Sequence, residues 1–364
     1  KKAFRLFLYL NLFFLLTSPY SLQAKAQLPQ GLEENLYQQA LQGQKLIINR
    51  DYTQAQKFFQ NLQKDYPNSP LPSFGLMTLY NTLMMENLDQ AYLEAFFQEA
   101  RNHNYYVHEA LKKEKPSTWD YFLCGSGQGL QALRLLEQEK TLEALGSAQK
   151  ARSCFNQALK QDPQFHDAKL GLGLYLYWRS VFTAHYHLPF FKDQRKEGLQ
   201  LMEEARLQGL LTQDLSSFAL LLAYFQEGKS KQGLAICEAV LKNHPKNLLA
   251  KIYQGRFLLR LGKKTEAQKL YAQLTEQYPD TPLLEFFLGL SQGAMGKNQE
   301  AKKHFLNYLK SQPLPVRQAY THYQLGILYL REKQRPKAKE HFKQGQIIYP
   351  KWKANGTMLK RLSS

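Results

Sequence analysis

The sequence predicts an all-α protein, built as a solenoid of antiparallel helix hairpins. In its C-terminal half, three classes of residue recur with a spacing of 34. They are Pro245, Pro279 and Pro313; Gly228, Gly262 and Gly296; and Gly233, Ala267 and Ala301. Apolar residues between them follow helical spacing, so each period contains two amphipathic helices. We expect the glycine in the turn between the two helices, and the proline after the second helix, because proline cannot continue a helix.

The pattern within each period resembles the tetratricopeptide repeat, in which Leu-Gly-x-x-Tyr, Ala-x-x-x-Phe and Pro follow one another. The last period gives the fullest match, with Leu325, Gly326, Tyr329, Ala338, Phe342 and Pro350. An earlier match near the start has Gly43, Ala55, Phe59 and Pro67. The resemblance implies a right-handed superhelix, in which small residues let paired helices approach closely and the aromatic residue fills the space beside them. It is specific for the fold and says little about function.

Eight repeat units are expected to cover nearly the whole chain. Their bounds are about 36–69, 70–116, 118–163, 166–211, 214–247, 248–281, 282–315 and 319–352. Units five to seven are regular, whereas units two to four are stretched, and unit four contains an inserted loop at roughly 180–192. A lead-in, residues 27–35, precedes the units, and a tail, residues 353–364, follows them.

The first 26 residues have the pattern of a secretory signal peptide. Three basic residues precede an apolar run from Leu6 to Leu16, and Ala24-Lys25-Ala26 supplies small residues around a cleavage point near Ala26. The run is shorter than the roughly 20 residues that span a bilayer. The mature protein is therefore expected in the periplasm of a bacterium or secreted. The alternative is an uncleaved N-terminal anchor.

Charge divides the rest of the chain into two unequal parts. Residues 27–227 contain 19 Lys and Arg against 22 Asp and Glu, whereas residues 228–364 contain 25 against 8. Outside the cytoplasm, a basic region suits anionic lipids, anionic envelope polymers or acidic proteins, and the compartment argues against nucleic acid. The expected contacts include Arg256, Arg260, Lys263, Lys264, Arg331 and Arg335. The plain alternative is a solvated outer face that keeps the protein dissolved.

A glycine-rich segment, YFLCGSGQGL at residues 121–130, has the composition of a phosphate-binding loop. However, Gly125, Gly127 and Gly129 miss the dinucleotide fingerprint, because the third glycine comes one residue early. The Lys-Ser/Thr of a P-loop is missing as well. A helix start at Pro116-Ser117-Thr118 precedes the segment. We therefore expect the glycines to be close-packing positions inside a long helix.

The sequence contains no pattern that indicates an enzyme. An HExxH motif, a GxSxG elbow and a supported carboxylate pair are all missing. His185 and His187 in the inserted loop could begin a metal site, but Zn²⁺ takes three or four ligands and Asp193 is the only acidic residue nearby. We therefore expect no enzyme, metal or cofactor, and keep a metal-dependent enzyme as the lesser alternative.

Two of the three cysteines face each other in the predicted hairpin of unit three. This hairpin turns near residues 139–140, and Cys124 and Cys154 are equally far from that turn to within one residue. In an oxidising compartment they could form a disulfide; otherwise they are two small buried residues. Cys237 occupies the aromatic position of its repeat and is expected to be a lone buried thiol.

The expected function is that of a non-catalytic scaffold or adaptor that binds a peptide or protein. In the superhelix that the resemblance implies, the first helix of each unit lines a concave groove. The groove residues would be Tyr177, Trp178, Phe218, Phe225, Ile252, Arg256, Arg260, Phe286, Leu290, Tyr323, Ile327 and Arg331. Aromatic residues would anchor a peptide there and arginines would bind its carboxylates. Two alternatives stay open: these residues pack helix against helix, or the protein is an envelope transport or assembly accessory that binds anionic lipid or polymer through its basic half.

Overall fold

The structure, a computed structural model, describes residues 28–87, 90–185 and 192–363. The predicted signal peptide and residues 186–191 of the loop of unit four lie outside these residues. The described residues form 17 helices: α2 (Glu34–Ile48), α3 (Tyr52–Asp65), α4 (Pro70–Asn87), α5 (Leu93–Leu111), α6 (Thr118–Glu137), α7 (Thr141–Gln161), α8 (His166–His185), α9 (Arg195–Gln208), α10 (Gln213–Gln226), α11 (Ser230–Asn243), α12 (Leu248–Arg260), α13 (Lys264–Gln277), α14 (Leu283–Ala294), α15 (Asn298–Lys310), α16 (Pro315–Arg331), α17 (Arg335–Ile348) and α18 (Ala354–Ser363). Among these helices, none has the length and apolar composition that crossing a membrane would require.

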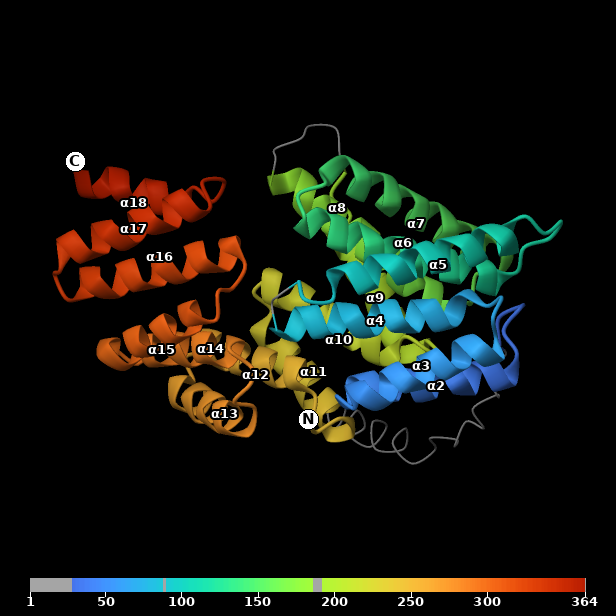
Figure 1. The fold of residues 1–364 in the computed structure, drawn as a ribbon, viewed down its shortest axis with the longest axis horizontal. Helices are drawn as coiled ribbons and strands as arrows, with labels where there is room; N and C mark the ends of the chain where they lie inside the picture. Colours follow the sequence, from blue (N-terminus) through green and yellow to red (C-terminus); the bar gives the residue numbers. More distant parts are fainter. Residues whose placement is uncertain (1–27, 88–89, 186–191, 364) are drawn as a thin grey trace, which may run out of the picture.

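Sixteen of the helices form eight successive antiparallel pairs, from α2–α3 to α16–α17. The pairs stack side by side along the molecule (Figure 1). Each pair lies in one of the segments into which the sequence divides, with its ends shifted by a few residues. The predicted all-α class and the architecture of stacked helix hairpins are confirmed.

Residues 353–364, expected as a tail outside the repeats, contain a further helix. α18 packs on α17 and α16. Its Asn355 is completely buried, and the side-chain amide donates a hydrogen bond of 3.1 Å to the backbone oxygen of Ala319. A Cβ atom at Gly345 of α17 would lie 2.3 Å from that amide nitrogen, so glycine is needed for α18 to approach. α18 therefore covers the end of the last pair, as terminal helices of solenoids generally do.

Within the pairs, an aromatic ring of the second helix presses against a glycine of the first. A Cβ atom at Gly326 would lie 2.5 Å from the ring of Phe342. The ring of Phe59 lies against Gly43 of its own pair and Gly75 of the next, at 2.3 and 2.2 Å from the corresponding Cβ positions. Because any side chain at these glycines would overlap the ring, the small residue sets the distance between the helices, as the resemblance implies.

The glycine-rich segment 121–130 lies inside α6, which begins with a capping box as the sequence indicates. Gly125 faces Phe155, and a Cβ atom there would lie 2.6 Å from the ring. Gly127 faces His103, with a corresponding distance of 2.2 Å. Gly129 has no neighbouring atom within 4 Å of such a Cβ position. Close packing, expected for all three glycines, is thus confirmed for the first two and wrong for the third.

The turns inside six of the pairs place one residue in the left-handed backbone region. In units five to seven this residue is the predicted glycine: Gly228 (φ 72°), Gly262 (φ 79°) and Gly296 (φ 81°). In units one, three and eight it is Arg50 (φ 65°), Glu139 (φ 63°) and Lys333 (φ 60°). A residue with a Cβ atom loses about 1–2 kcal/mol in this conformation. For Arg50 and Glu139, contacts of the side chain, described below, act against this loss.

A disulfide joins α6 and α7. It links Cys124 and Cys154, whose Cα atoms are 5.9 Å apart, and it is the pair that the hairpin register predicts. Such bonds persist mainly in oxidising compartments. Cys237 is a buried free thiol, and desolvation by burial raises its pKa to about 12.

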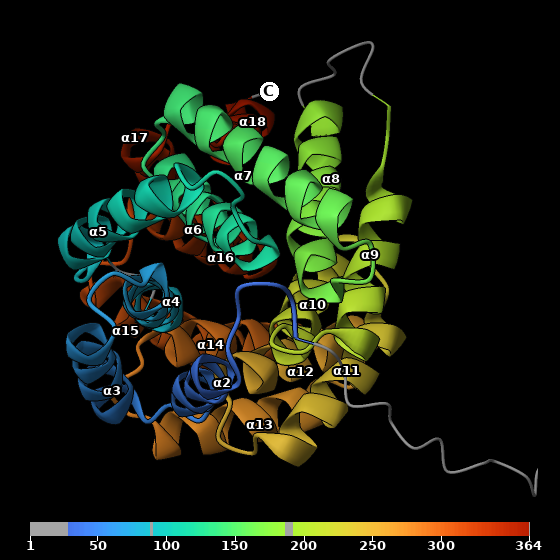
Figure 2. The same ribbon diagram turned by 90° about the vertical axis from the view of Figure 1, so that its right-hand side faces the viewer.

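Unit one contacts the end of unit five, although the two are far apart in the sequence. The side-chain amide of Asn247, before α12, donates a hydrogen bond of 3.1 Å to the backbone oxygen of Ile48 at the end of α2. Nδ1 of His244 lies 3.1 Å from Oδ1 of Asn49 in the same turn. Seen from the end of the molecule, the helices form a ring, with the even-numbered helices from α2 to α16 toward its middle and most odd-numbered helices outside (Figure 2).

The side chain of Arg50 links unit one to unit two and to unit six. Its guanidinium forms an ion pair of 3.0 Å with Glu86, whose side chain is almost fully buried. The same group lies 4.4 Å from the ring centroid of Tyr278, which follows α13. The positive φ of Arg50 therefore comes with contacts that a glycine could not make.

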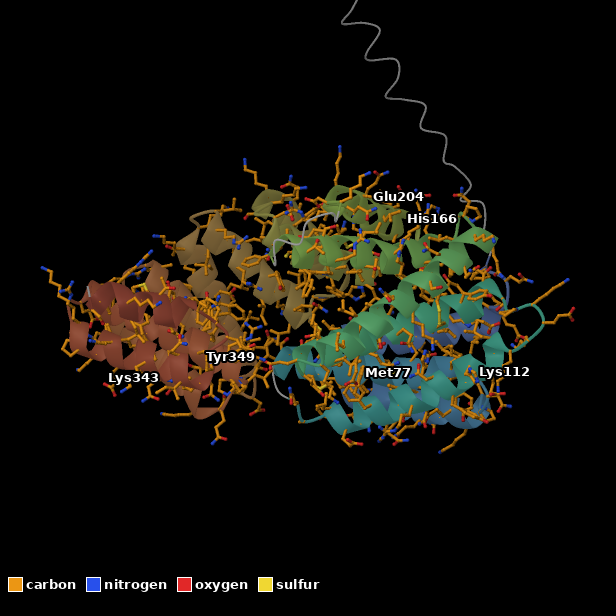
Figure 3. The ribbon with its side chains drawn as sticks, turned by 90° about the horizontal axis from the view of Figure 1, so that it is seen from above. Met77, Lys112, His166, Glu204, Lys343 and Tyr349 are labelled. Carbon is orange, nitrogen blue, oxygen red and sulfur yellow. A yellow bond between two sulfur atoms is a disulfide. The ribbon has the colours of Figure 1, made fainter. Side chains whose placement is uncertain are left out.

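The side chain of Glu139 makes a second long-range contact, from unit three to unit eight. It accepts a hydrogen bond of 3.1 Å from the hydroxyl of Tyr349 and forms an ion pair with Lys351. Figure 3 shows Tyr349 on the side of the C-terminal units that faces the N-terminal units. The groups are exposed, so solvent weakens the attraction.

Candidate partner-binding surface

The predicted groove residues belong to the even-numbered helices, which lie toward the middle of the ring (Figure 2). α10, α12, α14 and α16 follow one another on this inner side, and α10 contacts α12 as α12 contacts α14. Their C-terminal ends carry Arg260, at the end of α12, and Arg331, at the end of α16. This row of helix ends is the candidate site.

Two arginines of α12 hold an aromatic ring of α10. The guanidinium carbons of Arg256 and Arg260 lie 3.6 and 3.5 Å from the ring centroid of Phe225. Two such groups do not fit on one face of a ring, so the ring lies between them. Each contact of this kind contributes about 0.5–1 kcal/mol at an exposed site. Desolvation by burial and the charge of Arg256 lower the pKa of Arg260.

The arginines also bind the carbonyl oxygens at helix ends. Arg260 donates to the backbone oxygen of Phe225, near the end of α10. Nη1 of Arg331 donates a hydrogen bond of 2.8 Å to the backbone oxygen of Gly293, near the end of α14. A cation is favourable there because the last carbonyls of a helix carry partial negative charge. A guanidinium has five N–H donors, so these bonds leave donors for a ligand.

No carboxylate neutralises these arginines. Among the ion pairs of the described residues, none involves Arg256, Arg260 or Arg331. The ion pairs in the C-terminal units are formed by other basic residues. Arg260 and Arg331 are exposed and Arg256 is half-buried. Three unpaired guanidiniums therefore lie along the inner helices, and an anionic group is the chemical complement they lack.

Three residues predicted to line the groove are instead buried. Tyr177 has no exposed surface, and Ile252 and Phe286 are each 3% exposed. The hydroxyl of Tyr177 lies 3.0 Å from a carboxylate oxygen of Glu227, beyond the end of α10. Phe286 packs among aromatic rings of α14, α15 and α16. The prediction is wrong for these three, because neighbouring inner helices touch and use the side chains for their own packing.

The other predicted groove residues keep some accessible surface. Trp178 is 38% exposed. Phe218, Phe225, Leu290, Tyr323 and Ile327 are half-buried. Tyr323 packs against the ring of Trp352, with centroids 5.3 Å apart, so part of its surface is used within the last unit. The surface that remains for a partner is therefore narrower and more basic than the sequence indicates.

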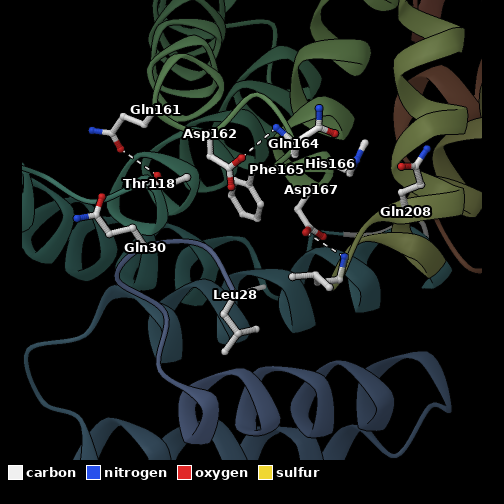
Figure 4. A pocket seen from close by; sticks show the side chains of 11 residues that line it. Leu28, Gln30, Thr118, Gln161, Asp162, Gln164, Phe165, His166, Asp167 and Gln208 are labelled. Carbon is white, nitrogen blue, oxygen red and sulfur yellow. Dashed lines mark hydrogen bonds between the residues drawn. The ribbon is translucent and has the colours of Figure 1, made fainter. Parts of the chain in front are cut away.

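A cavity of about 600 Å³, which the sequence did not reveal, is lined by residues other than those predicted for the groove (Figure 4). It opens where the lead-in meets the turns around α6, α8 and α10, and is lined by Leu28, Gln30, Thr118, Gln161, Asp162, Gln164, Phe165, His166, Asp167, Gln208 and Leu210. Asp167 accepts hydrogen bonds from the backbone N–H groups of Leu210, Leu211 and Thr212, and Thr118 donates to Gln161. Most of the polar groups thus hold the junction together.

The metal hypothesis gains no further ligands. The side chains that the structure describes include no group of three or more His, Cys, Asp or Glu that could hold a metal ion. His187 and its neighbours lie outside the described residues, and the side chain of His185 is not described either.

Comparison with known proteins agrees with the repeat. Three segments, residues 34–69, 132–179 and 224–285, match family models described as tetratricopeptide repeat. No curated protein sequence matches the chain significantly.

Two solved structures illustrate the likeness of fold. One is a chain of the APC/C hetero-tetramer Cut9–Hcn1, with 15% identity and a TM-score of 0.60 over 92% of this chain. This chain spans only 57% of that one. The other is a tetratricopeptide repeat protein from Parabacteroides merdae ATCC 43184, with 15% identity and a TM-score of 0.52 over 78% of this chain and 99% of that one. The matches show that the chain contains tetratricopeptide repeats in these three segments, and the eight helix pairs have the corresponding fold.

Proposed function

We propose that the protein is a non-catalytic scaffold that binds an acidic peptide or protein segment along the inner helices of units five to eight. Tetratricopeptide repeats typically mediate protein–protein interaction, and the family is generally non-catalytic. The signal-peptide pattern of residues 1–26 and the disulfide between α6 and α7 support a place outside the cytoplasm, in the periplasm or secreted.

The observation that carries the proposal is the pair of unpaired arginines around Phe225. The ring fixes the guanidiniums of Arg256 and Arg260 before a ligand arrives, so binding orders few side chains. Each can bind a carboxylate through two parallel N–H donors. Arg331 offers a third guanidinium two inner helices further along. A segment with several carboxylates fits this spacing of charge better than a neutral one.

The test compares an inner and an outer variant with the same change in charge. Arg256→Glu with Arg331→Glu reverses two inner arginines, whereas Arg335→Glu with Lys339→Glu reverses two cations on the outer side of α17. An array of acidic 12-residue peptides, with neutral isosteric peptides beside them, selects a ligand for the wild-type protein. We expect the inner variant to bind it at least about a hundredfold more weakly, because each charged hydrogen bond contributes about 1.5–3 kcal/mol. The outer variant should bind within about threefold of wild type.

Both variants must keep the helical circular-dichroism signal and the melting temperature of the wild-type protein. Equal losses in the two variants would mean that only net charge matters. An inner variant that binds as well as wild type would place the site elsewhere.

A further inference from the structure

The outer side of α17 carries a row of unpaired cations. Arg335, Lys339 and Lys343 follow one another every four residues, about 6 Å apart along the helix, and all three are exposed. None of them takes part in an ion pair of the described chain. Glu340 is the only acidic residue of this helix. The positive charges of these three residues are therefore available to an anionic ligand.

Apolar side chains continue this basic pattern. Ile347, four residues after Lys343, is 61% exposed. α15 has a similar outer side, where Leu306, 42% exposed, lies between the exposed Lys303 and Lys310. Cations combined with a few exposed apolar residues on one side of a helix are typical of helices that lie at a membrane interface.

The orientation of α17 is fixed by its buried side. Ala338 and Phe342 have no exposed surface and, with Gly345, face α16 and α18. The cations therefore cannot turn toward the inner helices. Lys343 lies on the C-terminal end of the molecule, away from the units that Tyr349 faces (Figure 3). This surface is separate from the inner arginines, so what it binds does not depend on the proposed peptide function.

We propose that the outer sides of α17 and α15 bind the surface of an anionic phospholipid bilayer. Arg335, Lys339 and Lys343 would contact lipid phosphates, and Ile347 would enter the interface between head groups and acyl chains. The positive charge is complementary to such a surface. A bilayer also accounts for the exposed side chains of Ile347 and Leu306. Their burial is favourable only if an apolar layer lies beneath the anionic head groups. A soluble polyanion would use the cations alone.

Vesicle sedimentation tests the proposal on the full mature chain. The vesicles contain 30% phosphatidylglycerol in phosphatidylcholine, with pure phosphatidylcholine as the neutral comparison. The variant R335S/K339S/K343S should bind the anionic vesicles about a hundredfold more weakly, at about fivefold per cation. The matched control K231S/K242S/K269S removes three exposed cations from α11 and α13 and should lose less than fivefold.

A second variant separates a bilayer from a soluble polyanion. Ile347→Ser should weaken binding to anionic vesicles severalfold and leave binding to heparin, the soluble probe, unchanged. If the two triple variants lose binding equally, or if wild type binds neutral vesicles equally well, the proposal is overturned. It is also overturned if Ile347→Ser has no effect and heparin competes fully with vesicles, since a soluble polyanion is then the ligand.

Discussion

Units one and three, in the N-terminal half, and units five to seven, in the C-terminal half, build the same turn from different residues. Units five to seven have glycine at the left-handed position, whereas units one and three have Arg50 and Glu139 there. The glycines themselves bring no side chain to such contacts, and a Cβ atom at Gly228, Gly262 or Gly296 would meet nothing within 4 Å. Arg50 and Glu139 use their side chains to reach units far along the chain.

This difference shows that the regular units depend on contacts between neighbouring units. Units one and three also make contacts with units far along the chain, which hold the ring of helices together. The long helices α6 and α7, the disulfide and both long-range turns all belong to the first three units. The second half has the more regular spacing and most of the positive charge. We infer that the N-terminal units hold the shape and leave the C-terminal units free to carry binding surfaces.

The largest expected effect comes from removing the disulfide of the N-terminal half. Cys124→Ala with Cys154→Ala should lower the free energy of unfolding by about 3–4 kcal/mol, because the bond closes a loop of 30 residues in the unfolded chain. Urea denaturation measures this loss. Thiol counting in denaturant should find one free thiol, that of Cys237, in the wild-type protein. Three free thiols after isolation under oxidising conditions would contradict the disulfide.

The spacing of the sequence was enough to predict the fold because each unit is held together locally. Gly326 and Phe342 pack within one pair, and their places in the sequence determine that contact. The same spacing located Cys124 opposite Cys154. The tail was missed because α18 has no repeat signature of its own, and only its packing against Ala319 and Gly345 makes it part of the core.

The candidate site was less predictable, because it depends on how closely successive pairs wind together. The sequence identifies Tyr177 and Phe286 as inner-helix residues but does not reveal that neighbouring helices cover them. The contact of Asn247 with Ile48 depends on the rotation accumulated over several units, which no local pattern contains. The charge of Arg256 and Arg260 was visible in the sequence, whereas their stacking on Phe225 required the structure.

A smaller effect on the free energy of unfolding is expected in the turns. Substitution by glycine should have opposite effects at Arg50, which makes a long-range contact, and at Lys333, which makes none with the described residues. Lys333→Gly relieves the left-handed conformation and should stabilise the protein by about 1 kcal/mol. Arg50→Gly relieves the same conformation but leaves the buried Glu86 without its cation, so it should destabilise by about 2 kcal/mol. Urea denaturation of both variants gives the comparison. If Arg50→Gly is also stabilising, the contacts with Glu86 and Tyr278 do not offset the conformational loss.

The smallest expected effect on stability comes from substitution of Glu139. The same substitution is expected to change the shape of the molecule. Its hydrogen bonds with Lys351 and Tyr349 lower the pKa of the carboxyl group. A carboxyl group with a lowered folded pKa stabilises the contact above its ordinary pKa, about 4.3, and the stabilisation is lost as the pH falls through the folded value. Because the groups are exposed, Glu139→Gly should hardly change the unfolding transition.

Small-angle scattering should nevertheless give a larger radius of gyration for Glu139→Gly at neutral pH, since the tip of α6–α7 no longer holds the end of α17. Lys333→Gly, which introduces glycine at the same position of a turn that lacks such a contact, should leave the radius unchanged. Wild type should approach the Glu139→Gly value as the pH falls below the folded pKa of Glu139. If the two variants scatter alike at neutral pH, the ring is held closed by the contacts around Arg50 and Asn247 alone, and unit three serves only to stiffen the N-terminal half.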